Sequence, residues 1–480
     1  MTEDKLPESG PRRRRRRRRS PQQADVGEPK SVTVDSSSES TSAAPEATDG
    51  KAPPPRRRRR RRRPGAIPDA ASDESASTDL KTDSTQSAVP ARKSERPPKR
   101  TSKPPIEVEI EGILDMFPGG SGYLRQIDAD LAEQKTDPMV PANIIKKFQL
   151  KRGHHLVGKG IASQGHQSPK MTYLESIDGL DMSEHRRRPG FKNLTVIDPD
   201  FHYELGTHKG DGQISMRVLD LLSPLGRGQR GLLVAPPRTG KTTIMQQIAE
   251  AIEALYPEIH LIVLLIDERP EEATYWKRAI KNGEVFVSTM DEKPKNHVRL
   301  AELVQYHAER LVETGKDVVI LLDSITRLTR AYNNTLSGKD SKVMSGGLDA
   351  RVFTKPKHFF GAARNTETAG SLTILATALV RTGSKMDDII FEEFKGTGNM
   401  ELTLHRMLAD RRIYPAIDIE ATGTRKEEKL YTRVTMRKIN ILRRVLSTLR
   451  PREAVEMLID RMHRYPSNQD FLGAFSLDDV

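Results

Sequence analysis

A lysine and a threonine follow a short loop between an apolar stretch and a helical pattern. GLLVA at 231–235 leads into PPRTGKTT and then into IMQQIAEAIEAL, where apolar residues recur at helical spacing. Loops of this kind turn backbone N–H groups toward a polyphosphate. Lys241 would then reach the outer phosphate oxygens and the Thr242 hydroxyl would ligate Mg²⁺. The spacing predicts a nucleotide-binding loop, although Ala235 stands where the usual pattern has glycine.

Two carboxylates follow other buried-strand patterns. VVILLD ends in Asp323, 82 residues after Lys241, and LLIDE ends in Glu268. A nucleotide-binding loop needs a partner carboxylate at a neighbouring strand end, so we expect Asp323 to orient Mg²⁺ through water. Glu268 is placed to accept a proton from the water that attacks the γ-phosphate. From the pattern alone, Asp323 could instead cap its strand, and Glu268 could equally be an ion-pair partner of Arg269.

The strands that would position these residues alternate with helical patterns over residues 211–480. This alternation predicts an α/β fold in which a parallel sheet carries helices on both faces. Residues 106–182 instead hold short strand-like pieces separated by Gly, Pro and Asp, beginning with IEVEIEGILDMF, and this pattern predicts a small β-barrel. Residues 183–210, which include EHRRRPGF, are interpreted as a linker.

The basic character of the chain belongs to its first 105 residues. They hold 26 basic and 15 acidic side chains, a balance of +11, so the remaining 375 residues carry only +2 of the net charge of +13. The segment has no Phe, Trp or Tyr and is crowded with Pro, Ser, Ala, Asp and Arg, which predicts disorder. Its arginine blocks, 12–19 and 56–63, would bind phosphates without reading sequence. A merely solubilising tail is the alternative.

Several classes of protein are excluded by composition. The chain has no cysteine, so it forms neither disulfides nor thiolate zinc sites. Its start, MTEDKLPESG, does not resemble a signal peptide. Apolar runs such as LIVLLI at 261–266 are far short of the roughly 20 residues that a membrane helix needs. We therefore expect a soluble, cytoplasmic protein with no membrane partner.

Seven stretches, in order along the chain, are similar to those of the bacterial transcription termination factor Rho family. They are LLSPLGRGQRGLLVAPPRTGKTT, LLIDERPEE, LLDSITRLTRAYN, FFGAARN, LVRTGSKMDD, FEEFKGTGNMEL and GTRKEE. The resemblance implies a RecA-like ATPase that forms a homohexameric ring, with ATP and Mg²⁺ as cofactors. It also implies that the ring threads single-stranded RNA and releases transcripts from the RNA polymerase elongation complex.

The resemblance also implies roles for individual residues. Lys241, Asp323 and Glu268 would carry the catalysis, with Arg425 as an arginine finger and Arg412 as a second arginine facing the neighbour's phosphates. The nucleotide contacts would be Gly226, Arg227, Gly228, Gln229, Arg230, Gly231, Arg238, Thr239, Gly240, Lys241, Thr242, Thr243, Arg269 and Tyr414. Tyr414 would stack on adenine. Without the resemblance, Arg425 would be a solvated partner of Glu427 or Glu428, and Tyr414 a core residue.

The smaller domain resembles the family's OB-type RNA-binding barrel. Its RNA contacts would be Gly120, Ser121, Gly122, Tyr123, Leu124, Arg125, Asp137, Met139, Lys170 and Met171, and the pore loops would add Lys342 and Lys385. Tyr123 would stack a base and Arg125 would pair a phosphate. Ser121, Met139 and Met171 stand where the family usually has aromatics, which predicts weaker capture of RNA. No helical bundle is recognisable before the barrel.

Other classes of protein share the nucleotide loop or the basic tail. A rotary ATP synthase subunit or a DNA recombinase would share the nucleotide loop, but neither explains the barrel followed by LVRTGSKMDD and GTRKEE. A nucleic-acid scaffold that works through its basic tail is an alternative from another class. The joint presence of Lys241, Thr242, Glu268, Asp323 and Arg425 argues against a decayed ATPase core.

Overall fold

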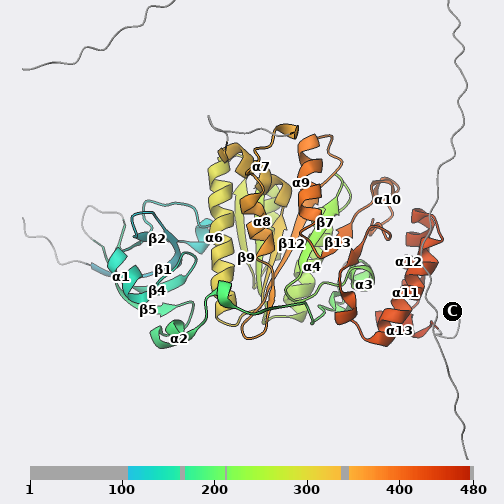
Figure 1. Ribbon diagram of the computed structural model, residues 1–480, viewed down its shortest axis with the longest axis horizontal. Coiled ribbons are helices and arrows are strands. Elements are labelled where there is room, and N and C mark those ends of the chain that lie inside the picture. The colour runs from blue at the N-terminus through green and yellow to red at the C-terminus, as the bar shows by residue number, and fades with distance from the viewer. Residues whose placement is uncertain (1–105, 163–167, 211–212, 337–344, 476–480) are drawn as a thin grey trace, which may run out of the picture. The chain divides into compact units, whose positions relative to one another are not determined.

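The structure is a computed structural model that describes residues 106–162, 168–210, 213–336 and 345–475 (Figure 1). The expectations for residues 1–105, including both arginine blocks, and for Lys342 lie outside these ranges. Within the described ranges, no helix is long and apolar enough to cross a lipid bilayer.

The first described segment forms a closed five-stranded barrel in the order β1–β2–β3–β5–β4. Its strands are β1 (Ile106–Met116), β2 (Gly122–Arg125), β3 (Met139–Val140), β4 (His155–Ala162) and β5 (Lys170–Ile177), with helix α1 (Ala142–Phe148) between β3 and β4. Ile110, Leu114 and Leu124 are among the apolar side chains that fill its interior. The predicted β-barrel is confirmed.

The stretch expected to be a linker is structured. It begins with helix α2 (Met182–Arg187), whose N-terminus is capped by the Asp181 side chain. Further along, β6 (Val196–Ile197) pairs with β11 (Asn365–Thr366) of the larger domain. The chain after the barrel is therefore fastened to the α/β domain rather than spanning freely toward it.

The larger domain is built on a seven-stranded sheet in the order β14–β13–β7–β12–β10–β8–β9. The strands are β7 (Arg230–Ala235), β8 (His260–Glu268), β9 (Glu284–Thr289), β10 (Val318–Asp323), β12 (Leu372–Leu379), β13 (Met400–Thr403) and β14 (Gly423–Thr424). All neighbouring strands pair in parallel except β14, which is antiparallel to β13. The carboxyl ends of β7, β10 and β8 therefore lie at one edge of the sheet.

Helices cover both faces of this sheet (Figure 1). The helices of the larger domain are α3 (Gln213–Leu222), α4 (Lys241–Leu255), α5 (Pro270–Ala279), α6 (Pro294–Glu313), α7 (Ile325–Leu336), α8 (Thr354–Gly361), α9 (Lys385–Lys395), α10 (Arg406–Asp410), α11 (Arg433–Ser447), α12 (Pro451–His463) and α13 (Asn468–Gly473). Leu233 of β7 packs in the core with α3, α4 and α11–α13, whereas its neighbours Leu232 and Val234 pack in the core with α6–α9. Strands buried on both faces explain the continuous apolar runs, and the α/β prediction is confirmed.

Candidate functional site

The predicted nucleotide-binding loop joins the end of β7 to the start of α4. Arg238 and Gly240 have positive φ angles of 62° and 89°, which bend the chain sharply before the helix. The Thr239 hydroxyl donates to the carbonyl of Pro236 at 2.7 Å and closes the loop on itself. Lys241 is the first helical residue, so the free N–H groups of the first turn of α4 point toward the space that an anion would occupy.

Lys241 and Asp323 form a close ion pair at this edge of the sheet. The Lys241 Nζ lies 2.5 and 2.6 Å from the two carboxylate oxygens of Asp323, although β12 separates their strands. Thr377, on that intervening strand, donates its hydroxyl to Asp323 Oδ1 at 2.7 Å. Asp323 is 1% exposed. This carboxylate is therefore fully buried and compensated by a cation and a hydroxyl, which is more than a strand cap requires.

Glu268 joins the same cluster from the end of β8. Its Oε1 lies 3.5 Å from Lys241 Nζ and 3.1 Å from Arg327 Nη1, while Arg269 is exposed. Burial, and then the nearby charge of Asp323, raise the pKa of Glu268 to about 7. A carboxyl group with this pKa is poised to exchange a proton near neutral pH, as a general base must.

The cluster offers the oxygen donors that Mg²⁺ prefers. Asp323 presents two carboxylate oxygens, and Thr242 stands one residue beyond Lys241 in the first turn of α4. Both carboxylate oxygens of Asp323 now face the ammonium group of Lys241. A bound polyphosphate would compete for that ammonium group, so these residues fit a magnesium–nucleotide complex.

The segment around α10 borders the nucleotide-binding loop. Arg406 donates to the carbonyl of Pro237, which holds this segment against the loop. The Tyr414 ring lies over Gly240, so close that a Cβ at that glycine would sit 3.7 Å from Cε1. Tyr414 is 46% exposed, so it is not a core residue. Arg412, two residues earlier, is exposed on the same edge.

A second group of predicted nucleotide contacts lies at the opposite end of β7. The segment 226–231 leads into the start of that strand, whereas the nucleotide-binding loop follows its end. The backbone carbonyl of Asn399 accepts two hydrogen bonds. One comes from Gln229 Nε2 at 3.1 Å and the other from the Arg425 backbone N–H at 2.8 Å. The exposed Arg425 therefore stands beside this segment and away from the loop of its own chain. Glu427 is held by Arg443.

The barrel presents an aromatic pair that the sequence did not reveal. The rings of Phe117 and Tyr123 meet edge to face, with centroids 5.7 Å apart and planes at 83°. Phe117 N–H donates to the Ser121 carbonyl at 3.0 Å across the PGGSG turn. Ser121 carries no ring at the position where an aromatic was expected, and Phe117 supplies one from the other side of the same turn. The available signal was the strand–turn–strand pattern that sets these residues opposite each other.

Arg125 differs from expectation. Instead of pointing freely toward a phosphate, it is 3% exposed and is held by Asp137 at 2.5 Å, Asp115 at 3.3 Å and Glu133 at 3.3 Å. Its guanidinium carbon lies 5.7 Å from the centroid of the Tyr123 ring. A buried guanidinium without charged partners would be costly, so the three carboxylates satisfy it. Arg125 therefore packs beside the rings of Phe117 and Tyr123 rather than pointing freely toward a phosphate.

The two methionines occupy different environments. Met171 is 1% exposed and packs in the barrel interior, so it offers no platform for a base. Met139 is half-buried and lies opposite Tyr123 in the β2–β3 register. Lys170 and Tyr173 are exposed and help to line a hollow of about 400 Å³ between α1 and β5. Register shifts between β4 and β5 disturb the simple alternation that would have marked Met171 as inward-facing.

Lys385 opens helix α9 and is exposed. The nearby Gly346 packs on Met386, since a Cβ at Gly346 would lie 3.4 Å from the Met386 Cα. Gly346 is thus adjacent to the start of α9.

Two family models match the chain. Residues 110–183 match the model described as Rho termination factor, RNA-binding domain. Residues 215–423 match the model described as ATP synthase alpha/beta family, nucleotide-binding domain. The first covers the barrel and the second covers the nucleotide-binding loop, Glu268 and Asp323.

Curated relatives are similar over most of the chain. Transcription termination factor Rho of Aquifex aeolicus is 47% identical over 373 residues, covering 77% of this chain and 85% of the relative. The factor of the same name from Haemophilus influenzae is 47% identical and covers 75% and 86%, and that from Pseudomonas aeruginosa is 46% identical and covers 77% and 88%. Among solved structures, the assembled ATPase EscN from enteropathogenic E. coli gives a TM-score of 0.48 at 19% identity, covering 75% of this chain and 87% of that one.

Proposed function

The chain belongs to the family of transcription termination factor Rho, and from this premise we propose that it couples ATP hydrolysis to movement along RNA. In this proposal it captures nascent single-stranded RNA, translocates along it as an RNA-dependent ATPase, and releases it from the RNA polymerase elongation complex in the cytoplasm. The observation that carries the proposal is that Lys241, directly after a nucleotide-binding loop, contacts the buried carboxylates of Asp323 and Glu268.

The cluster suggests how hydrolysis would begin. In the structure, Lys241 neutralises Asp323. When ATP binds, Lys241 would turn to the outer phosphates and leave Asp323 to hold the water shell of Mg²⁺. Glu268, with its pKa raised to about 7 by burial and by Asp323, would take the proton from the attacking water. Mg²⁺ bound with ATP supplies neutralisation of the phosphate charge.

The two ends of β7 suggest a ring. One end carries the nucleotide-binding loop, and the other carries the segment 226–231 beside Arg425. Because these lie apart in one chain, we propose that Arg425 and this segment complete the site of the next subunit in a homohexamer. An arginine finger supplied in this way contributes about 10³ to 10⁵ in rate in related phosphoryl-transfer enzymes.

RNA would meet two separate surfaces. The aromatic pair of Phe117 and Tyr123 gives the barrel a stacking platform for first capture. Lys385, together with Lys342, would hold phosphates in the ring's pore and move with the nucleotide state. Ser121, Met139 and Met171 leave the barrel short of aromatic rings for stacking. Phe117 adds one ring and so reduces that shortage.

ATP hydrolysis measured with and without RNA tests the proposal. Wild-type chain should hydrolyse ATP faster when RNA is added, and Lys241→Ala should abolish the activity. Lys277→Ala is the control, because Lys277 is an exposed lysine that lies away from the nucleotide-binding loop. Its Nζ pairs with Asp130 Oδ2 at a distance of 2.7 Å. Absent hydrolysis, or hydrolysis that ignores RNA, would favour a nucleic-acid scaffold instead.

A further inference from the structure

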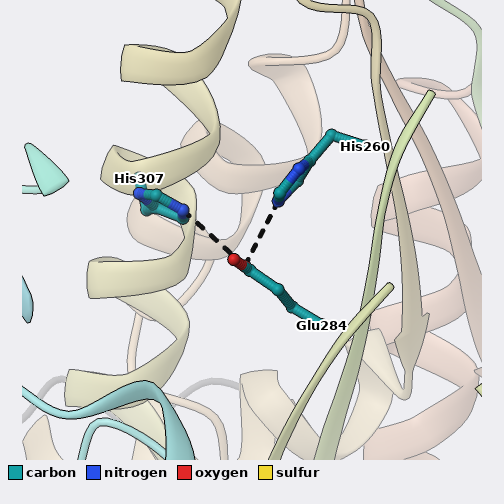
Figure 2. Close-up of side chains that lie close together, drawn as sticks. All are labelled: His260, Glu284 and His307. Carbon is teal, nitrogen blue, oxygen red and sulfur yellow. Dashed lines mark ion pairs between the residues drawn. The ribbon is translucent and has the colours of Figure 1, made fainter. Parts of the chain in front are cut away.

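Three side chains converge at the amino ends of the sheet strands (Figure 2). His260 is the first residue of β8, Glu284 is the first residue of β9, and His307 lies in α6. The Nε2 atoms of His260 and His307 are 3.3 and 3.6 Å from Glu284 Oε2, and the three atoms lie within 4.8 Å of one another. β8 separates this cluster from Glu268 by about 26 Å of strand. The cluster is therefore distinct from the nucleotide site.

Glu284 forms ion pairs with both histidines, but none of these three atoms makes a hydrogen bond of good geometry. His260 Nε2, His307 Nε2 and Glu284 Oε2 are all buried without a hydrogen-bond partner among the described residues. Buried polar atoms of this kind are uncommon in native proteins and indicate an additional partner. Three of them facing one another indicate that a single group between them would satisfy all three.

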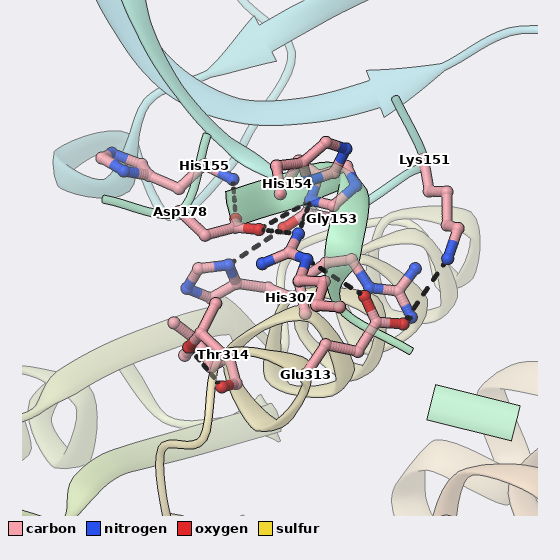
Figure 3. Close-up of polar contacts among 12 residues, drawn as sticks. Lys151, Gly153, His154, His155, Asp178, His307, Glu313 and Thr314 are labelled. Carbon is pink, nitrogen blue, oxygen red and sulfur yellow. Dashed lines mark hydrogen bonds and ion pairs between the residues drawn. The ribbon is translucent and has the colours of Figure 1, made fainter. Parts of the chain in front are cut away.

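The hydrogen bond of His307 to the barrel indicates that a positive charge belongs between these atoms. His307 Nδ1 lies 3.0 Å from the carbonyl oxygen of Gly153 (Figure 3). A carbonyl only accepts, so Nδ1 carries a proton; in a neutral ring Nε2 then turns its lone pair toward Glu284, whereas in a protonated ring Nε2–H donates to that carboxylate. A lone pair facing a carboxylate oxygen is repulsive unless a positive charge intervenes. An added proton on His307 would satisfy one pair, whereas a metal ion would satisfy all three atoms.

The distances suit a small tetrahedral ion. With metal–ligand bonds of about 2.0 to 2.2 Å, neighbouring ligand atoms of a tetrahedral zinc site lie about 3.3 to 3.6 Å apart. The two separations in the cluster, 3.3 and 3.6 Å, have this length. Imidazole nitrogen also disfavours Mg²⁺ and Ca²⁺, which take oxygen ligands. We propose that His260, Glu284 and His307 bind one Zn²⁺ ion, with water in the fourth position.

The surroundings of His307 give the ion a structural role. Metal-binding histidines usually donate their second N–H to a carbonyl or carboxylate, as His307 does to Gly153. Gly153 belongs to the barrel, and a Cβ on it would lie 2.6 Å from the His307 backbone nitrogen, so the two backbones are in contact. The adjacent His154 is held by Asp178 at 2.7 Å (Figure 3). Asp178 is in turn paired with Arg188. The ion would therefore lock β8, β9 and α6 together at the point where the barrel docks.

Metal content tests this assignment. The full-length chain, without a histidine tag or nucleotide, is stripped with a chelator, incubated with Zn²⁺ and gel-filtered before elemental analysis. One tightly held zinc ion per chain is expected, together with a higher Tm in Zn²⁺ than in chelator. The chain has no cysteine, so retained zinc cannot be bound by thiolates. A wild-type chain that retains no zinc and shows no Tm shift would overturn the proposal and leave a protonated ion pair.

Variants locate the ion. His260→Gln and Glu284→Gln should each lose the retained zinc and the Tm shift. His297→Gln is the matched control, because His297 lies on the same helix as His307 but pairs with Ser288 at 2.7 Å. Equal zinc in His260→Gln and the wild type would refute the assignment. If the variants fail to fold, Co²⁺ added to the stripped wild-type chain should give the visible absorption of a tetrahedral site, which Zn²⁺ then displaces; absence of that absorption overturns the proposal.

Discussion

The ammonium group of Lys241 contacts both carboxylate oxygens of Asp323, at 2.5 and 2.6 Å. Lys241 follows strand β7 and Asp323 ends strand β10, and β12 separates these two strands. Lys241→Met should destabilise the nucleotide-free chain by about 3 to 5 kcal/mol, because removing one partner of a buried pair leaves the other charge uncompensated. Denaturant unfolding at fixed protein concentration measures the change.

A double variant and an exposed pair serve as controls for this prediction. The double variant Lys241→Met, Asp323→Asn should lose less free energy of unfolding than the sum of the losses in the two single variants, since neither charge is left without its partner. Lys277→Met, which removes an exposed pair with Asp130, should change the free energy of unfolding by only about 0 to 1 kcal/mol. Additive effects of Lys241→Met and Asp323→Asn would show that the two residues do not interact.

Glu268 should make both activity and stability depend on pH. Burial and Asp323 raise its pKa from 4.5 to about 7, so ATP hydrolysis should increase as the pH rises through about 7, where the base loses its proton. Glu268→Gln should be inactive across the range. Glu271→Gln, an exposed change on α5, should keep the wild-type profile. A flat wild-type profile would argue against Glu268 as the base.

The sign for stability is opposite to that for activity. Between pH 4.5 and about 7 the folded chain keeps the Glu268 proton that the unfolded chain has lost. The contribution of Glu268 to the free energy of unfolding is therefore complete below pH 4.5. It is lost as the pH rises to about 7, by an amount on the order of 3 kcal/mol. The stability of wild type relative to Glu268→Gln should fall over this window. A difference that stays constant with pH would contradict the raised pKa.

Local patterns in the sequence predicted the parts of the site that lie on one element. The strand–loop–helix around Lys241 and the strand ends at Asp323 and Glu268 are visible because apolar runs mark buried strands. Contacts between elements were not visible. The sequence does not show that Thr377 supports Asp323, or that Phe117 supplies a ring beside Tyr123.

The His260, Glu284 and His307 cluster was beyond sequence reasoning for the same physical reason. Its members begin two strands and sit within a helix, separated by 24 and 23 residues, so no metal-binding spacing appears. For Met171, the sequence suggested a site residue that the structure does not support. Its match to an aromatic family position suggested a surface role, but its strand turns the side chain into the barrel interior.

Phe117 should contribute to RNA capture. Phe117→Ala and Tyr123→Ala should each weaken binding of a single-stranded oligonucleotide by about 1 to 3 kcal/mol, the usual contribution of a stacked base. Fluorescence anisotropy with the full-length chain measures the change. Tyr275→Ala removes a similarly exposed aromatic on α5 and should leave affinity unchanged. If Phe117→Ala binds as the wild type does, the edge-to-face pair is only structural.

Arg425 should act on a neighbouring subunit. Arg425→Ala and Lys241→Ala chains should each lack ATPase activity alone. When the two chains are mixed, some subunit interfaces pair the intact Lys241 site of the Arg425→Ala chain with the intact Arg425 of the Lys241→Ala chain. Part of the ATPase activity should therefore return. Mixing Lys241→Ala with Glu268→Ala should restore nothing, because both changes fall in the same half of the site. No recovery in the first mixture would place Arg425 within its own chain's site or outside any site.

The arginine blocks should set the salt dependence of RNA binding. If they engage about eight phosphates on a single strand, the logarithm of the binding constant should fall with the logarithm of salt concentration at a slope of about −6, since each phosphate contributes roughly −0.7. Deleting residues 1–104 should weaken binding and flatten that slope, while ATPase activity at saturating RNA stays nearly intact because the catalytic cluster lies more than 130 residues further on. Replacing the sixteen arginines of both blocks with glutamine, at unchanged length, should reproduce the effect. An unchanged slope in both variants would leave the blocks no role in RNA binding.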